Sequence, residues 1–356
     1  WFYFGNWKVR FASGFPLMCQ SRPYLEWKIR ERVKKLGNVS FEEETDVRGF
    51  TTTADGNRVN GVRIARRNGG EHEAAIAADL VVDATGRGTR TPQWLEALGF
   101  GRPPETELKV DVGYSSRVYK KPPSAGRDWK VLLVYPKFPD SKLGVIVPAE
   151  GDRWIVTLVG WYGDHPGGDE ESFQVFAKAL PVPDLYDAIQ GAEPLSPIAL
   201  HKFPSNWRRH YERMPAFPDG LAVIGDASCS FNPTYGQGMT TGSIGGDALD
   251  RCLEREGGLT PGFSRRFQAQ LAKLIDVPWL LTTSEDTRNP SVTGQRPAWM
   301  PILQWYTARI HRLTWSDTFT AGRFLQVMHL TERPTALFHP RIFLRAMTLA
   351  GNPRVG

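Results

Sequence analysis

The stretch Gly220-Leu-Ala-Val-Ile-Gly-Asp-Ala-Ser-Cys-Ser-Phe-Asn-Pro-Thr-Tyr-Gly-Gln-Gly-Met239 joins a short apolar run to a carboxylate and a loop containing glycine. The run Leu221–Ile224 is typical of a fully buried parallel strand. Asp226 follows at its carboxyl end, which is where open α/β sheets bind ligands. Gly236-Gln-Gly238 then leads into a helical pattern that runs from Met239 to about Glu254. The stretch therefore predicts a ligand site made of a strand end, a carboxylate and a helix N-terminus.

Two interpretations of Asp226 are open from the residues alone. It accepts hydrogen bonds from a ligand hydroxyl, such as that of a ribityl chain, or it is a turn or N-cap aspartate. Gly236 and Gly238 flank Gln237, so backbone N–H groups can approach a planar ligand without obstruction by a Cβ. The positive end of the helix dipole stabilises an anion, and a reduced flavin carries negative charge along one edge. Pro233 would stiffen the loop against such a ring, so a flavin is a natural ligand for this site.

The glycine spacing at the start of this helix does not match a dinucleotide fingerprint. That fingerprint places its glycines directly at the strand end, whereas ten residues separate Gly225 from Gly236. We therefore expect Gly242, Gly245 and Gly246 to allow close packing of the helix.

Length, charge and cysteine usage narrow the class of protein. The 356 residues can bury a large core and suggest about two domains. The net charge is +6, from 44 Lys+Arg and 38 Asp+Glu, but the basic residues are spread along the chain, which argues against nucleic acid as a partner. Three cysteines without metal-ligand spacing favour a reducing, cytoplasmic compartment, with Cys229 as a small buried filler. We expect no metal site, and no apolar run approaches the ~18–20 residues of a membrane span.

Further elements are predicted on both sides of the opening stretch. Residues 1–19 suggest a strand or hairpin, Ser21-Arg22-Pro23 begins a helix that Gly37 ends, and 79–86 form a second buried strand. Between them, a β-meander over 39–76 is expected to turn at Asp55-Gly56, Asn60-Gly61 and Asn68-Gly69-Gly70.

The remaining residues predict an antiparallel sheet and a helical region. The strand candidates are Lys130–Tyr135, Leu143–Val147 and Trp154–Trp161. Residues 170–190 have a helical pattern. Beyond Gly262 several helices are expected, broken at Pro290, Pro297 and Pro301. Arg208, Arg209 and Tyr211, just before the opening strand, either touch cofactor or substrate or form solvated surface, and we interpret them as solvated surface.

Three separated motifs resemble those of FAD-dependent monooxygenases of the aromatic hydroxylase type. Gly225-Asp226-Ala227 with Pro233 and Gly236-Gln-Gly238-Met239 is similar to their second flavin-contacting motif. Asp79-Leu-Val-Val-Asp-Ala-Thr-Gly-Arg-Gly-Thr-Arg90 resembles their middle motif, with Thr85 where the commoner form has a carboxylate. Ser21-Arg22-Pro-x-Leu25-Glu26 resembles the helix whose arginine lies near FAD. The middle motif, Asp152-Arg-Trp-Ile-Val and Thr282-Thr-Ser-Glu-Asp286 look closest to the branch that includes polyether-type flavin epoxidases.

The resemblance implies an α/β fold with a glutathione-reductase-type FAD-binding domain, an antiparallel-sheet substrate domain and a helical C-terminus. The expected boundaries are 1–110 with 206–258 for the FAD domain, 111–205 for the substrate domain, and 259–356 for the helices. The first Rossmann unit of such proteins is missing, so we expect the sequence to be truncated at its N-terminus. The implied cofactor-binding residues are Arg22, Thr85, Gly86, Asp226, Pro233, Gly236, Gln237, Gly238 and Met239.

The implied function is that of an FAD-dependent monooxygenase acting on an apolar or aromatic small molecule. NAD(P)H reduces FAD, O2 adds at flavin C4a, and the hydroperoxide hydroxylates or epoxidises the substrate. Because the cofactor supplies the hard chemistry, no acid–base triad is expected. Two alternatives stay open: an FAD-dependent reductase or dehydrogenase of isoprenoid-type double bonds, and an inactive flavoprotein fragment.

Overall fold

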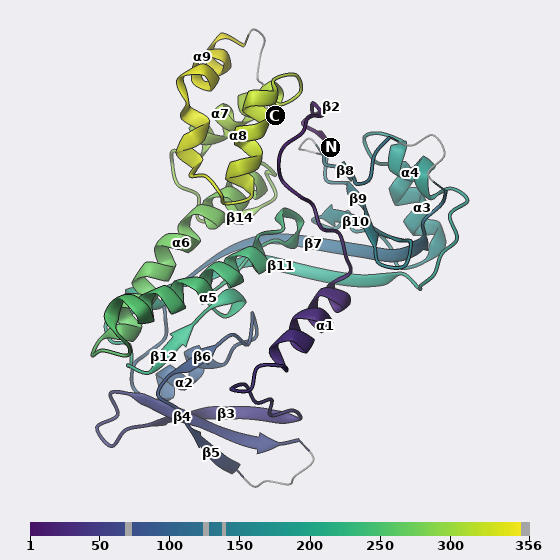
Figure 1. Ribbon diagram of the computed structural model, residues 1–356. Helices are drawn as coiled ribbons and strands as arrows, with labels where there is room; N and C mark the ends of the chain where they lie inside the picture. Colours follow the sequence, from purple (N-terminus) through teal and green to yellow (C-terminus); the bar gives the residue numbers. More distant parts are fainter. Residues whose placement is uncertain (68–72, 124–127, 137–139, 350–356) are drawn as a thin grey trace. The chain divides into compact units, whose positions relative to one another are not determined.

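The computed structural model describes residues 1–67, 73–123, 128–136 and 140–349, which fold into two compact units. Unit 1 comprises 1–39, 109–204 and 284–356, and unit 2 comprises 40–108 and 205–283. The elements that pass from one unit into the other are β7 (Glu105–Lys120), β11 (Ala199–Arg209) and α6 (Phe263–Asp286) (Figure 1). These two units are defined by how compactly their residues pack, whereas the expected domain boundaries come from the family resemblance. The units therefore do not test those boundaries, which stay a prediction.

Unit 2 is built on a short parallel strand pair. β12 (Leu221–Val223) pairs in parallel with β6 (Val81–Asp83), and all three residues of β12 are buried. The predicted buried strand at the opening stretch is therefore confirmed. β6 is less enclosed than predicted, since Val82 is 40% exposed. The core beside β12 contains side chains from α5 (Gln237–Glu256) and α6, among them Ala248, Phe267 and Leu271.

The predicted β-meander is present in unit 2 with one error. β3 (Thr45–Thr52), β4 (Val59–Arg66) and β5 (Glu73–Ala77) pair antiparallel in chain order, and Asp55-Gly56 lies in the first connection (Figure 1). Asn60-Gly61 lies inside β4 and is not a turn. A Cβ on Gly61 would lie 2.3 Å from the carbonyl oxygen of Ile76, so glycine is needed there for close strand approach. Asn68-Gly69-Gly70 lies outside the described residues.

Unit 1 contains the predicted antiparallel sheet. β10 (Arg153–Trp161) lies between β7 and β9 (Leu143–Ala149), and β8 (Leu132–Val134) follows β9, all with antiparallel pairing. The hairpin of β1 (Phe2–Tyr3) and β2 (Asn6–Trp7) extends this sheet, because β1 pairs in parallel with β8. Helices α3 (Glu170–Lys178) and α4 (Asp184–Ile189) bury Phe173, Leu185 and neighbouring side chains against it.

The helical C-terminal part of unit 1 is also as predicted. The remaining helices are α1 (Arg22–Val33), α2 (Thr91–Ala97, in unit 2), α7 (Met300–Leu313), α8 (Thr318–Met328) and α9 (Pro340–Thr348) (Figure 1). The short elements are β13 (Cys229–Ser230), β14 (Thr293–Gly294) and the 3-10 turns Tyr211–Arg213, Gly225–Ala227, Pro233–Tyr235 and Pro334–Phe338.

Pro301 lies in the first turn of α7, so it begins a helix where a break was predicted. Among the described residues, no helix combines the length and apolarity needed to cross a bilayer.

Candidate functional site

The loops of the two motifs that resemble flavin-contacting sequences begin at the same edge of the strand pair in unit 2. Val223, the last residue of β12, is the direct partner of Asp83, the last residue of β6, in the parallel register. Because parallel strands end together, the loops after both strands start side by side. This edge is where α/β sheets bind their ligands.

Asp83 holds the loop of the middle motif in place. Its carboxylate is 6% exposed and accepts hydrogen bonds from the Thr85 N–H (2.9 Å) and the hydroxyls of Thr85 and Thr91 (both 2.6 Å). The Thr89 hydroxyl donates to it as well. A buried carboxylate with several donors is a fixed anchor. The hydroxyl of Thr85 thus bonds within its own loop, and the assignment of Thr85 to the cofactor stays a prediction.

The second motif brings Asp226 to the start of α5. Asp226 is exposed, and its Oδ1 lies 3.7 Å from where a Cβ on Gly238 would be. Gly236 precedes the helix in the left-handed conformation, φ 68°, and contributes no side-chain cap. Among the described residues, nothing lies within 4 Å of the position of a Cβ on Gly236. The helix start therefore opens onto free space with a carboxylate beside it.

The other predicted residues of this motif differ in exposure. Pro233 opens a 3-10 turn and is exposed, and the Asn232 side chain accepts from the Thr234 N–H at 3.2 Å. Met239 is 56% exposed, whereas Gln237 is 3% exposed. Gln237 is thus almost fully enclosed, and its assignment to the cofactor stays a prediction. Gly86 of the middle motif has φ 83° and open space around it.

Arg87, which the sequence did not assign to the site, lies at the same edge. Arg87 donates to the carbonyl oxygen of Ser205 (2.6 Å) and to its hydroxyl (2.7 Å). Burial lowers the pKa of Arg87, while the carboxylates of Glu107 and Asp226 raise it. The charge of the exposed Asp226 therefore acts on a partly buried cation at this edge, a combination that sequence spacing alone could not reveal.

The prediction that Arg208, Arg209 and Tyr211 form solvated surface is wrong. Their exposed fractions are 5%, 4% and 1%. Arg208 is compensated by Asp276 at 2.7 Å. Arg209 donates to the carbonyl oxygens of Ala227 (3.2 Å) and Arg87 (3.0 Å), and so connects the two loops. Buried arginine is tolerated where such partners exist, and these partners lie far along the chain.

Predictions were also made for Cys229, as a buried filler, and for Arg22, as a cofactor-binding residue. Cys229 is 1% exposed, and burial raises the pKa of its thiol far above the ordinary value, as expected of a buried filler. Arg22 is the first residue of α1, after the N-cap Ser21, and is exposed. It belongs to unit 1, so its assignment to the cofactor stays a prediction. Among the described residues, no group of three His, Cys, Asp or Glu side chains could hold a metal ion.

A family model described as an FAD binding domain matches residues 13–249, which include the loops after β6 and β12. The chain belongs to this FAD-binding family. Protein Rv3254 of Mycobacterium tuberculosis is 33% identical over 302 residues, which is 82% of this chain and 61% of that protein. The chain thus spans less than two thirds of its curated relative.

Solved structures confirm the fold of this FAD-binding chain. A flavoprotein/dehydrogenase from Cytophaga hutchinsonii is similar over 90% of this chain and 71% of its own, with a TM-score of 0.61 and 16% identity. OxyS anhydrotetracycline hydroxylase from Streptomyces rimosus is similar over 88% of this chain and 58% of its own, with a TM-score of 0.54 and 15% identity. The α/β fold with an antiparallel sheet and a helical C-terminal part is therefore that of flavin-dependent enzymes.

Proposed function

We propose that this chain forms the flavin- and substrate-binding part of an FAD-dependent monooxygenase that uses NAD(P)H and O2 on an apolar or aromatic small molecule. The observation that carries the proposal is the edge of unit 2, where the exposed Asp226 lies beside the open start of α5. A carboxylate suits the hydroxyls of a ribityl chain. A helix N-terminus suits the negative edge of a reduced flavin ring.

The chemistry of the residues at this edge suits FAD. Asp226 would accept from the ribityl hydroxyls, and the backbone at Gly236–Met239 would face the ring, with Pro233 stiffening the loop. An added Cβ on Gly236 would point into the space that the ligand needs. When bound, FAD would supply the redox chemistry and the activation of O2, so the chain's own residues have to bind, orient and exclude water.

A second candidate is an FAD-dependent reductase or dehydrogenase of isoprenoid-type double bonds. It is favoured by the similarity in fold to a protein named flavoprotein/dehydrogenase. Substrate-dependent O2 consumption with labelled O2 distinguishes the two. Label in the product supports the monooxygenase, whereas a reduced product without label supports the reductase.

The binding proposal is tested by substituting Asp226. The chain is produced together with any coding sequence that precedes it, and flavin retention is measured by absorbance after gel filtration. Asp226→Ala should weaken FAD binding by ~10–100-fold, the effect of losing a hydrogen bond to a charged group. Asp247→Ala is the matched control, because Asp247 is also an exposed acid, on α5. Equal retention in both variants would remove the role given to Asp226.

A further inference from the structure

Unit 1 contains a pocket that none of the flavin-related motifs accounts for. Its volume is about 260 Å³, close to the ~300 Å³ lower end of small-molecule sites. Trp1, Phe11 and Phe324 supply aromatic walls. The polar residues that line it include Lys8 and Thr314. The pocket thus combines flat apolar surfaces with a cation.

The hairpin of β1 and β2 fixes Lys8 at this pocket. The Lys8 N–H donates to the carbonyl oxygen of Trp1 (2.8 Å), and the next N–H, of Val9, donates to that of Thr314 (3.0 Å). The hairpin turns at Phe4 and Gly5, which both have positive φ, as a two-residue type I′ turn requires. Phe4 keeps this unfavourable conformation while 8% exposed and stacked on His311. The backbone at Lys8 is therefore fixed by hydrogen bonds to Trp1 within the hairpin and to Thr314 at the end of α7.

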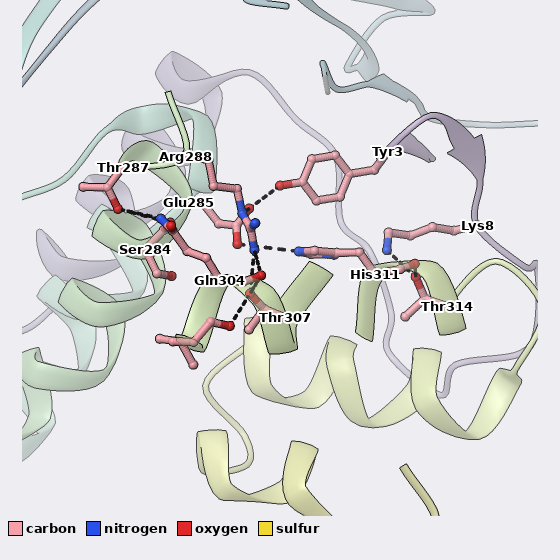
Figure 2. Close-up of polar contacts among 11 residues, drawn as sticks. Tyr3, Lys8, Ser284, Glu285, Thr287, Arg288, Gln304, Thr307, His311 and Thr314 are labelled. Carbon is pink, nitrogen blue, oxygen red and sulfur yellow. Dashed lines mark hydrogen bonds and ion pairs between the residues drawn. The ribbon is translucent and has the colours of Figure 1, made fainter. Parts of the chain in front are cut away.

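The ammonium group of Lys8 has a hydroxyl and ring faces as its partners. Nζ donates to Thr314 Oγ1 at 2.5 Å, and Figure 2 shows the side chain directed at that residue. It also lies 4.8 Å from the ring centroid of Trp1 and 4.7 Å from that of Phe324. Cation–π contacts of this kind stabilise a cation only modestly. Burial lowers the pKa of Lys8 to about 7, against the opposing charge of Glu285.

Glu285, the acid whose charge acts on Lys8, is hydrogen-bonded to other residues. Glu285 accepts from the Tyr3 hydroxyl at 2.5 Å and from Arg288 Nε at 3.0 Å, as Figure 2 shows. Arg10, the other cation lining the pocket, is ion-paired with Asp128. The remaining titratable groups near Lys8 are Tyr3, whose ring lies 5.5 Å from Nζ, and His311. Within the described residues, the Lys8 amine thus lines the pocket without a carboxylate partner of its own.

We propose that this pocket binds a small planar aromatic molecule carrying one carboxylate, with the Lys8 ammonium as its counter-ion. The ring of the ligand packs against Trp1 and Phe324, and its carboxylate accepts a hydrogen bond from Nζ. A charge-assisted hydrogen bond is roughly twice as strong as one between neutral groups. Binding of this ligand does not depend on the proposed function. Its identification as the molecule that the enzyme oxidises does rest on that function.

Binding of such an anion is linked to proton uptake. Near neutral pH a large fraction of Lys8 is uncharged, and an incoming carboxylate favours the ammonium form. At about pH 8 the complex therefore takes up close to one proton, and at about pH 6, where Lys8 is already protonated, it takes up almost none. A neutral ligand causes no such uptake.

Calorimetric titration with naphthoate tests the site without relying on flavin or turnover. The full chain is titrated in two buffers of different ionisation enthalpy, and the difference in observed heat gives the number of protons taken up. We expect naphthoate to bind at least ~10-fold more tightly than naphthamide, its neutral counterpart. Proton uptake at the higher pH, measured on the unaltered protein, supports the proposal even where a variant folds poorly.

Substitution of Lys8 gives the second measurement. Lys8→Met should weaken naphthoate binding at least ~10-fold and abolish proton uptake. Lys28→Met is the control, because Lys28 also lies over an aromatic ring (4.4 Å, Trp27) but is exposed on α1. Equal affinity for naphthoate and naphthamide, absence of binding by both, or unchanged proton uptake in Lys8→Met would each overturn the proposal. If naphthoate binds as expected but the experiment with labelled O2 finds no label in any product, the binding site stands and the proposed monooxygenase function fails.

Discussion

The hydroxyl of Tyr3 donates a 2.5 Å hydrogen bond to Glu285, 282 positions further along the chain. The same carboxylate accepts from Arg288 and lies 3.6 Å from His311 Nε2 (Figure 2). Burial disfavours the charged carboxylate, but Arg288 and His311 outweigh this effect and hold the pKa of Glu285 well below its usual range. Glu285 thus joins the first strand of unit 1 to its C-terminal helices.

Replacing Glu285 tests how strongly this junction stabilises unit 1. Glu285→Gln leaves the Arg288 guanidinium, whose side chain is 2% exposed, without its counter-ion. Breaking a buried pair in this way should lower the free energy of unfolding by about 3–5 kcal/mol. Urea denaturation measures it. Glu332→Gln removes an exposed partner of Arg323 and should cost about 0–1 kcal/mol, so similar losses in the two variants would contradict the role of Glu285.

Lys8 should make the stability of the chain depend on pH in the alkaline range. Its pKa is about 7 in the folded chain, against an ordinary value of 10.5, so the unfolded state binds more protons between these two values. The free energy of unfolding contributed by Lys8 therefore rises as pH increases from about 7 to 10.5. Thermal unfolding of the unaltered chain and of Lys8→Met across this range measures the difference. Parallel curves would show that Lys8 is not desolvated.

His311 should act on stability in the acidic range. Burial lowers the pKa of His311 from 6.5 to about 4, despite the nearby Glu285 carboxylate. As pH falls through this window, the unfolded state takes up a proton that the folded state does not, so stability decreases. His311→Phe should flatten this part of the pH profile. Denaturation at several pH values checks it, and an unchanged slope in the variant would assign the acid sensitivity to other groups.

The sequence predicted the elements at this edge of unit 2 because the signals for them are local. An apolar run, a glycine that adopts positive φ and a helix start are each set within a few residues, and β12, Gly236 and α5 follow them. The burial of Arg208 and Arg209 was missed, since Asp276 and the loop carbonyls that compensate them are distant in sequence. The Tyr3–Glu285 junction escaped prediction for the same reason.

The glycines within α5 also differ from their predicted role. Close packing was expected at Gly242, Gly245 and Gly246, yet an added Cβ on Gly242 or Gly246 would meet no described atom within 4 Å. At Gly245 it would make ordinary contacts, 3.5 Å to Leu271 and 3.6 Å to Ile224. Gly242→Ala and Gly246→Ala should therefore each stabilise the chain by about 0.5–1 kcal/mol, measured by urea denaturation. Gly236→Ala, at φ 68°, should instead destabilise it by about 1–2 kcal/mol.

Substitution of Arg209 should show whether cofactor binding depends on the spacing of the two loops and not only on the stability of unit 2. Its guanidinium bonds the carbonyl oxygens of Ala227 and Arg87, one in the loop after each strand of the pair, so it fixes the spacing of the two loops. Arg209→Met leaves both buried acceptors without this donor, at a cost of about 1–3 kcal/mol for each. Arg209→Lys keeps the charge but cannot reproduce the planar fork, so it should restore little.

The measurement for Arg209 is FAD retention alongside thermal stability in the same preparations. Because the loops carry Asp226 and the middle motif, retention should fall at temperatures where the variant is still fully folded. Arg213→Met is the control, since Arg213 has 64% of its side chain exposed and pairs with Glu212 at 3.6 Å. Retention that falls only in step with unfolding would mean that Arg209 stabilises unit 2 without positioning the two loops for the cofactor.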